Sequence, residues 1–332
     1  MRFMESGGFS NLYLGRDLRS NRRVVIKIFQ NDKFDDFKEE ERYLRREKAF
    51  INIQSKFNPI GLKLIDSIVD LDDEDDPKFI LVTNYIKGQD FKPWFEDLIE
   101  RKDGDIYHYM IRYIFLPLAE YFASCHSHGL LHRDFSPSNV IISKKKNRYI
   151  PVVIDFGDSM NFDPAKLYDE PPLLEELADS EEDYIYTHGY SPPEVDDNKE
   201  FLPQSDIYAF GVVMFYAFSL GYERDDDDDY DEDYDEYDDS DDDDDDDDDY
   251  DEDYDEYGDD ASESANAADF QEYVLIPKEY NEDCPDDINE IVEKCTQEEP
   301  IDRYLSFDHL IVELRKYLKK YRESRRKSKK KS

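Results

Sequence analysis

The 332-residue sequence contains few cysteines, and their positions suit neither a disulfide framework nor a metal site. Cys125, Cys284 and Cys295 are odd in number and far apart, which favours a reducing compartment. Long hydrophobic runs are also missing: the longest nearly unbroken one, residues 207–220, has 14 residues and is too short to cross a bilayer. The first residues show no signal-peptide pattern. We therefore expect an intracellular protein, cytoplasmic or nuclear, without a membrane partner.

Positive charge is outnumbered about two to one, because 42 Lys and Arg residues stand against 85 Asp and Glu, and the formal net charge is −43. Residues 223–260 hold 29 acidic residues and one arginine, so 28 of the 43 excess negative charges lie in this segment. Its stretch Asp229–Asp238, rich in tyrosine, recurs 20 residues later with one change. Like charge at this density cannot form a core, so we expect a disordered acidic insert over residues 223–268. Three interpretations are open: a solvating expansion, a docking tract for basic proteins, or a site of tyrosine modification.

The end of the chain is basic. Residues 315–331 hold eleven Lys or Arg residues and a single acid, Glu323, and residues 319–332 form a basic tail. The pattern predicts a nuclear address, a contact with nucleic acid, or a contact with the acidic insert of the same chain. The acidity of the whole chain argues against nucleic acid as the main partner.

A carboxylate, an amide and a second carboxylate occur at a spacing that suits phosphoryl transfer. Residues 132–139 read His-Arg-Asp-Phe-Ser-Pro-Ser-Asn, and an Asp-Phe-Gly motif at residues 155–157 begins sixteen residues after Asn139. Oxygen ligands of this kind are those that Mg²⁺ prefers. The series resembles the catalytic and metal-binding loops of eukaryotic protein kinases. Ser136 stands where serine/threonine kinases usually carry a lysine.

The resemblance implies a role for each of these residues. Asp134 accepts a hydrogen bond and then a proton from the substrate hydroxyl, and Ser136 takes the place of the lysine that bridges the transferred phosphate. Asn139 and Asp155 hold two Mg²⁺ ions. Arg133 faces the activation segment. The cofactors implied are therefore ATP and Mg²⁺.

The N-terminal segment resembles the part of a kinase that binds nucleotide. Gly7, Gly8 and Phe9 form a tight turn between two expected strands, similar to the loop that covers the ATP phosphates. A hairpin turn without a ligand is the alternative. Lys27 follows 20 residues after Gly7 in a β-branched strand, residues 23–28, and resembles the lysine that contacts the phosphates.

A charged helix is expected over residues 34–54. It supplies the glutamate that pairs with the strand lysine; Glu47 is preferred and Glu40 is the alternative. Residues 79–88 resemble the strand that leads into the hinge between two lobes, where adenine binds. The cofactor contacts that the resemblance implies are Gly7, Gly8, Phe9, Leu12, Val25, Lys27, Glu47, Thr83, Tyr85 and Ile141.

The second half of the chain resembles the substrate-binding part of a kinase. Residues 111–128 predict a helix that leads to the catalytic loop, and residues 150–154 predict the strand that delivers the Asp-Phe-Gly motif. Residues 155–194 resemble the activation segment. Within it, Thr187 matches the threonine that serine/threonine kinases place beside the catalytic aspartate, which favours serine or threonine substrates over tyrosine.

Two residues far from the catalytic loop match the same family. Asp206 resembles the aspartate of the central helix that anchors the catalytic-loop backbone. Arg303 resembles an arginine that pairs with Glu194, and we predict a buried, structural ion pair between them.

These features predict an α+β, two-lobed protein kinase fold over residues 1–318, with a β-rich N-lobe at about 1–84 and a mainly helical C-lobe at about 88–318. The leading hypothesis is transfer of the ATP γ-phosphate to serine or threonine hydroxyls of protein substrates. The alternatives are a pseudokinase scaffold that binds nucleotide weakly, and a binding module in which the acidic insert captures basic proteins.

Overall fold

The computed structural model describes residues 1–30, 33–34, 37–58, 61–70, 78–101, 105–146, 148–162, 189–198, 201–222 and 274–331. Thr187, most of the activation segment and the acidic insert lie outside these residues.

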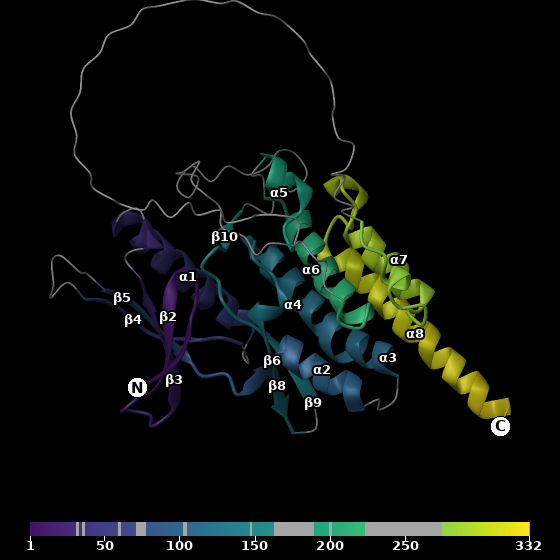
Figure 1. Cartoon of the computed structure of the whole chain (residues 1–332), viewed down its shortest axis with the longest axis horizontal. Coiled ribbons are helices and arrows are strands. Elements are labelled where there is room, and N and C mark those ends of the chain that lie inside the picture. The colour runs from purple at the N-terminus through teal and green to yellow at the C-terminus, as the bar shows by residue number, and fades with distance from the viewer. Residues whose placement is uncertain are drawn as a thin grey trace, which may run out of the picture. The chain divides into compact units, whose positions relative to one another are not determined.

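A five-stranded antiparallel sheet forms the N-terminal region (Figure 1). Its strands are β1 Arg2–Ser6, β2 Ser10–Arg16, β3 Arg23–Phe29, β4 Leu64–Asp70 and β5 Lys78–Asn84. They follow the order β1-β2-β3-β5-β4, so β3 is central. Its run of valine and isoleucine suits a pleated surface that is covered on one side.

Helix α1, Phe37–Phe57, packs against β4 and β5. We predicted this helix over residues 34–54, and it begins and ends three residues later. Leu44, Phe50 and Ile51 are its buried apolar residues, and Glu47 is buried beside them. A buried carboxylate is unfavourable without a partner, so Glu47 indicates a contact inside the fold.

The C-terminal region is mainly helical (Figure 1). Its α-helices are α2 Phe91–Arg101, α3 Ile106–Met110, α4 Leu116–Ser127, α5 Pro193–Asn198, α6 Pro203–Phe218, α7 Asp286–Cys295 and α8 Phe307–Lys331. Short 3₁₀ turns occur at Pro137–Asn139, Pro277–Glu279 and Pro300–Asp302. Its strands are β6 Gly88–Asp90, β7 Leu130–Leu131, β8 Val140–Lys145, β9 Arg148–Val153 and β10 Met160–Asn161. β6, β8 and β9 form one small sheet, and β7 pairs with β10.

The predicted helix over residues 111–128 is part of a longer helical path. α3 continues through a π-helical turn at residues 111–115 into α4. Ile111, Ile114 and Phe115 are buried at the i, i+3 and i+4 spacing of a helix face, so the π-helical turn leaves the hydrophobic pattern intact. The path begins at Ile106, five residues before the predicted start.

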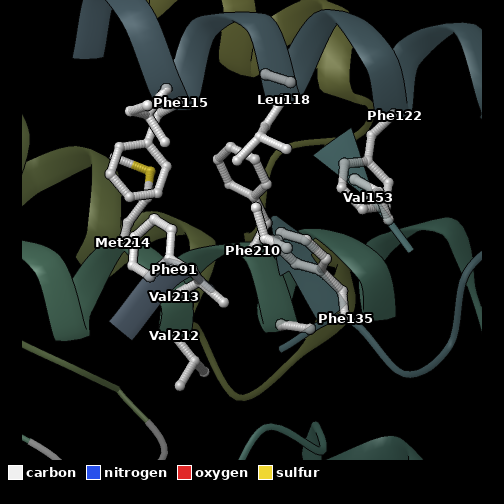
Figure 2. Packing of buried hydrophobic residues seen from close by; sticks show 14 of the residues in the cluster. Phe91, Phe115, Leu118, Phe122, Phe135, Val153, Phe210, Val212, Val213 and Met214 are labelled. Carbon is white, nitrogen blue, oxygen red and sulfur yellow. The ribbon is translucent and has the colours of Figure 1, made fainter. Parts of the chain in front are cut away.

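Helix α6 is the centre of the C-terminal core. It is apolar on all sides and almost entirely buried, as expected for a helix surrounded by others. Figure 2 shows Phe115 of the π-helical turn and Phe122 of α4 beside Phe210 of α6, with ring centroids 5.8 and 6.1 Å from that of Phe210. Gly211 allows α7 to approach closely, because a Cβ at this position would lie 2.5 Å from Cys295 Cβ.

The two chain segments beside the acidic insert are held on this core. Tyr222 stacks on Tyr280 with ring centroids 3.9 Å apart, and both rings contact Phe215 of α6 edge-on. The Leu275 backbone N–H donates to Thr296 Oγ1 at 2.9 Å. These contacts fix the chain on both sides of the insert.

The described residues confirm the predicted α+β fold, with a β-sheet N-terminal region and a helical C-terminal region.

Within the described ranges, no helix combines the length and the hydrophobicity needed to span a bilayer. Cys125, Cys284 and Cys295 are buried and have free thiols.

Candidate active site

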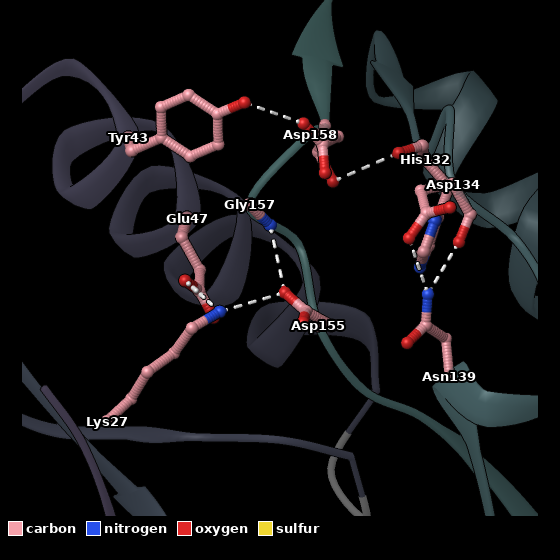
Figure 3. A network of polar contacts seen from close by, with 10 residues as sticks. Lys27, Tyr43, Glu47, His132, Asp134, Asn139, Asp155, Gly157 and Asp158 are labelled. Carbon is pink, nitrogen blue, oxygen red and sulfur yellow. Dashed lines mark hydrogen bonds and ion pairs between the residues drawn. The ribbon is translucent and has the colours of Figure 1, made fainter. Parts of the chain in front are cut away.

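Lys27 on β3 joins two carboxylates from different parts of the chain (Figure 3). Its Nζ lies 3.0 Å from Glu47 Oε2 on α1 and 3.0 Å from Asp155 Oδ1, just after β9. Of the two glutamates considered for this partner, Glu47 forms the ion pair. The Lys27 and Glu47 side chains are 13% and 3% exposed, so salt screens their attraction little.

Burial and charge together set the ionisation of these three groups. Burial alone would lower the pKa of Lys27, but Asp155 and Glu47 raise it above its usual value. Burial raises the pKa of Glu47 to about 7, and Lys27 opposes this rise. Burial also disfavours ionised Asp155, yet Lys27 holds the pKa of this carboxyl below its usual value. Lys27 is therefore a fixed cation.

The turn that carries Asp155 has a strained backbone. Asp155 has a φ of +58°, in the left-handed region that residues other than glycine rarely adopt. The Gly157 N–H donates to Asp155 Oδ1 at 3.2 Å. Phe156 stacks on Phe50 of α1 with ring centroids 4.5 Å apart and meets the His132 ring at 5.4 Å. These contacts hold the Asp155 carboxylate toward β3.

The predicted anchor of the catalytic loop is confirmed. Asp206 of α6 accepts hydrogen bonds from the backbone N–H groups of His132 and Arg133, both at 2.9 Å, and its Oδ2 lies 2.8 Å from His126 Nε2. Arg133 has a φ of +72°, and its guanidinium lies 3.9 Å from the centre of the Phe201 ring. Asp206 thus fixes the loop backbone immediately before the central aspartate of the motif.

Asn139 is bound to Asp134 within this loop. Its Nδ2 donates to the Asp134 carbonyl at 2.6 Å and to Asp134 Oδ2 at 2.9 Å. Because the amide nitrogen is engaged, the amide oxygen of Asn139 is the atom that can bind a cation. With the Asp155 carboxylate it offers hard oxygen donors that fit a divalent ion. The described residues include no group of three His, Cys, Asp or Glu side chains that could hold a metal, so phosphate or water oxygens would complete the shell.

A cavity of about 200 Å³ brings Lys27, Asp134 and Asp155 into one space. It is lined by Gly7, Gly8, Phe9, Ser10, Lys27, Phe29, Tyr43, Asp134, Asp155, Gly157 and Asp158. Glu47 and Asn139 are not in its lining, but they contact the lining residues Lys27 and Asp134. A glycine turn, a fixed lysine and cation-binding oxygens around one cavity are the parts needed to hold a polyphosphate with its metal ion.

Comparison with known proteins identifies the family, since residues 2–313 match the model of the protein kinase domain. The chain belongs to the protein kinase domain family. A probable serine/threonine-protein kinase of Clostridium perfringens is 23% identical over 94% of this chain and 37% of that protein. The probable serine/threonine-protein kinase PkwA of Thermomonospora curvata is 27% identical over 64% of this chain and 25% of that protein. The serine/threonine-protein kinase PrkC of Bacillus subtilis is 26% identical over 65% of this chain and 29% of that protein.

This kinase domain therefore spans between 25% and 37% of the length of these three relatives. Membership in the family implies use of ATP and a divalent metal ion.

The strand register places further predicted cofactor contacts on one face of the kinase N-terminal sheet. Leu12 lies opposite Lys27, and Val25 lies opposite Thr83. Side chains alternate between the two faces of a strand, so Leu12, Val25 and Thr83 share the face that carries Lys27. The nucleotide contacts predicted for Leu12, Val25 and Thr83 need these side chains on the same face as Lys27.

Tyr85 and Ile141 lie outside the lining of the cavity. The Arg23 guanidinium lies 4.2 Å from the centre of the Tyr85 ring. Ile141 lies in β8, opposite Val152 of β9. Their expected contacts with adenine stay predictions.

Ser136 also lies outside the cavity lining. It is 1% exposed, and its Oγ lies 2.7 Å from Ser138 Oγ. Of the described residues that line the cavity, Lys27 is the one cation.

Thr187 lies outside the described residues, so its place beside Asp134 stays a prediction.

Three polar residues of the cavity, Ser10, Tyr43 and Asp158, were not predicted from the sequence. Tyr43 lies one helical turn before Glu47 on α1, and its hydroxyl donates to Asp158 Oδ1 at 3.0 Å (Figure 3). Asp158 directly follows the Asp-Phe-Gly motif. The four-residue spacing from Glu47 and the proximity to the metal-binding motif are the signals that could have identified Tyr43 and Asp158.

The predicted ion pair between Glu194 of α5 and Arg303 is confirmed. Arg303 Nη1 and Nη2 each donate to a Glu194 oxygen at 2.7 Å, and the Arg303 and Glu194 side chains are 0% and 8% exposed. Arg303 also donates to the backbone carbonyls of Gln204, Gln297 and Glu298. The pair therefore joins α5 to the turn before α8 and stabilises the C-terminal part of the kinase domain.

Proposed function

We propose that this kinase domain transfers the γ-phosphate of Mg-ATP to serine or threonine hydroxyls of proteins. The observation that supports this most strongly is the single cavity shared by the glycine turn, Lys27, Asp134 and Asp155. Glu47 holds Lys27 beside this cavity through an ion pair, so a positive charge is in place before nucleotide arrives.

Four polar residues in or beside the cavity have a defined task in this proposal. Lys27 pairs with phosphate oxygens, and Asp134 accepts the hydroxyl hydrogen of the substrate and takes its proton. Asn139 and Asp155 hold Mg²⁺, which neutralises charge on the phosphate oxygens when it is bound.

The choice of serine or threonine is supported by the relatives and by one residue of the sequence. The three similar proteins carry the name serine/threonine-protein kinase. Thr187 matches the threonine that such kinases place beside the catalytic aspartate.

The test is transfer of labelled phosphate from Mg-ATP to a mixture of acidic and basic proteins by wild type and by Asp134→Asn. We expect the variant to be slower by a factor on the order of 10²–10⁴, because it lacks the general base. The products should contain phosphoserine or phosphothreonine. Wild-type transfer no faster than that of Asp134→Asn would refute the catalytic proposal, and phosphotyrosine alone would refute the proposed substrate class.

A pseudokinase scaffold is the second candidate, and the charge of the cavity favours it. Three aspartates and one lysine line the cavity, and Ser136 supplies no cation. Excess carboxylate repels phosphate groups. Calorimetric binding of Mg-ATP without any phosphate transfer would identify this second function.

We also propose that basic proteins bind to the acidic insert, residues 223–260, in the cytoplasm or nucleus. The 28 excess negative charges of the insert support this partner class. Helix α8 continues through the basic tail to Lys331 (Figure 1), and this run of lysine and arginine supports a nuclear address. Deletion of residues 223–260 should abolish capture of a lysine-rich protein; unchanged capture would exclude the insert as the docking tract.

A further inference from the structure

Three aromatic rings attach the tip of the glycine turn to helix α1. The ring centroid of Phe9, at the tip, lies 5.2 Å from that of Tyr43 and 5.4 Å from that of Phe34. The Tyr43 and Phe34 centroids are also 5.2 Å apart, and all three distances suit favourable aromatic pairs. The Gln30 backbone N–H donates to the Phe9 carbonyl at 3.0 Å. These contacts hold the tip of the glycine turn against Phe34, Tyr43 and the end of β3.

Tyr43 reaches a different segment through its hydroxyl, which donates to Asp158 Oδ1 at 3.0 Å (Figure 3). Asp158 lines the cavity and directly follows the Asp-Phe-Gly motif. Burial raises the pKa of Asp158 to about 6, with further contributions from Asp134 and Asp155. A buried carboxylate needs a hydrogen-bond donor, and the Tyr43 hydroxyl supplies one.

The place of Tyr43 on α1 links both contacts to the ion pair of Lys27. Tyr43 and Glu47 are four residues apart and so lie on the same face of the helix. One face of α1 therefore contacts the lysine, the tip of the glycine turn and Asp158. A displacement of α1 would disturb all three contacts together.

We propose that Tyr43 is a positioning residue for the nucleotide phosphates: its ring holds the glycine turn beside the cavity, and its hydroxyl holds the segment that follows the metal-binding motif. The inference rests on the proposed function, because it assigns Tyr43 a role in binding Mg-ATP. The ring and the hydroxyl contact different segments, so substitutions can separate their effects.

Four variants of the full chain test this role. Tyr43→Leu removes the ring and the hydroxyl, whereas Tyr43→Phe removes only the hydroxyl. Phe34→Leu removes a ring that supports Phe9 without lining the cavity. Tyr113→Phe, in the π-helical turn, is the matched control for loss of a tyrosine hydroxyl outside the cavity. Each variant is measured for its dissociation constant with Mg-ATP by calorimetry, for kcat and KM, and for its unfolding midpoint.

We expect Tyr43→Leu and Phe34→Leu to raise the dissociation constant and the KM for Mg-ATP about tenfold, since Tyr43→Leu loses two aromatic pairs and Phe34→Leu loses three. Tyr43→Phe should keep the dissociation constant of the wild type and lower kcat, because the glycine turn stays in place while the segment after the metal-binding motif is released. Tyr113→Phe should change neither quantity.

Several results would overturn the inference. A wild-type dissociation constant in folded Tyr43→Leu would exclude the role of the ring, and a wild-type kcat in Tyr43→Phe would exclude the role of the hydroxyl. If Tyr43→Leu does not fold, an unchanged dissociation constant in Phe34→Leu refutes the ring contact by itself. A wild-type chain that binds no Mg-ATP would overturn the proposed function as well, whereas wild-type binding with unaffected variants overturns the inference alone.

Discussion

The buried pair of Glu194 and Arg303 allows a test in which a second substitution should restore stability. Arg303→Met leaves the Glu194 carboxylate buried at 8% exposure without its cation, and among the described residues Ser205 Oγ is then its remaining side-chain donor. Breaking a buried ion pair in this way costs about 3–5 kcal/mol. Adding Glu194→Leu removes the stranded charge, so we expect the double variant to regain about 2–4 kcal/mol relative to Arg303→Met. Full recovery is not expected, because three backbone carbonyls lose the Arg303 donors.

The assay is equilibrium unfolding in urea, followed by the fluorescence of Trp94. This is the single tryptophan of the chain, and it is buried in α2 of the helical region that contains the pair. The exposed pair of Arg315 and Glu120, with side chains 60% and 47% exposed, is the matched control, and breaking it should cost less than about 1 kcal/mol. A double variant less stable than Arg303→Met would refute the reasoning.

Three further predictions use the same unfolding assay. Burial raises the pKa of Asp158 from 3.8 to about 6, so its contribution to stability is complete below about pH 4 and lost as pH rises through 6. Asp158→Asn should therefore gain up to about 3 kcal/mol relative to wild type at pH 8 and little at pH 4; equal differences at both pH values would contradict this. Replacing residues 223–273 with a short Gly-Ser linker should stabilise the domain by about 1–2 kcal/mol through lower loop-closure entropy, since Tyr222 and Tyr280 already hold both ends; a loss of stability would show that the insert supports the fold. Gly211→Ala should cost about 1–3 kcal/mol because its Cβ would lie 2.5 Å from Cys295 Cβ, whereas Gly8→Ala, with no atom within 4 Å, should cost less than Gly211→Ala; equal losses would exclude overpacking as the cause.

Sequence was most informative where chemistry fixes both the residue type and the spacing. The loop at residues 132–139 and the Asp-Phe-Gly motif could be found because metal and proton chemistry needs those side chains at that separation. Glu194 and Arg303 could be paired across 109 positions because both segments resemble parts of the kinase family that form such an ion pair.

Features that depend on tertiary packing could not be read in the same way. The π-helical turn at residues 111–115 differs from an α-helix in its backbone hydrogen bonds, and its buried residues keep the usual helical spacing, so the sequence pattern does not reveal it. The hydrogen bond from the Tyr43 hydroxyl to Asp158 joins residues 115 positions apart. The sequence places Tyr43 on a charged helix, where a tyrosine need not be buried, so its contact with Asp158 is not evident. Ser136 was assigned to the catalytic set by its place in a motif, but its side chain packs against Ser138, which only the folded loop reveals.

The left-handed backbone at Arg133 and Asp155 has a consequence for attempts to engineer this domain. A residue other than glycine in this region costs on the order of 1 kcal/mol, so glycine at either position relieves backbone strain. Asp155→Gly would relieve this strain but would also remove the carboxylate that pairs with Lys27 and is assigned to metal binding. Arg133→Gly relieves the same kind of strain and keeps all three aspartates of the cavity. A search for stabilising substitutions in this domain should therefore vary position 133 and leave position 155 unchanged.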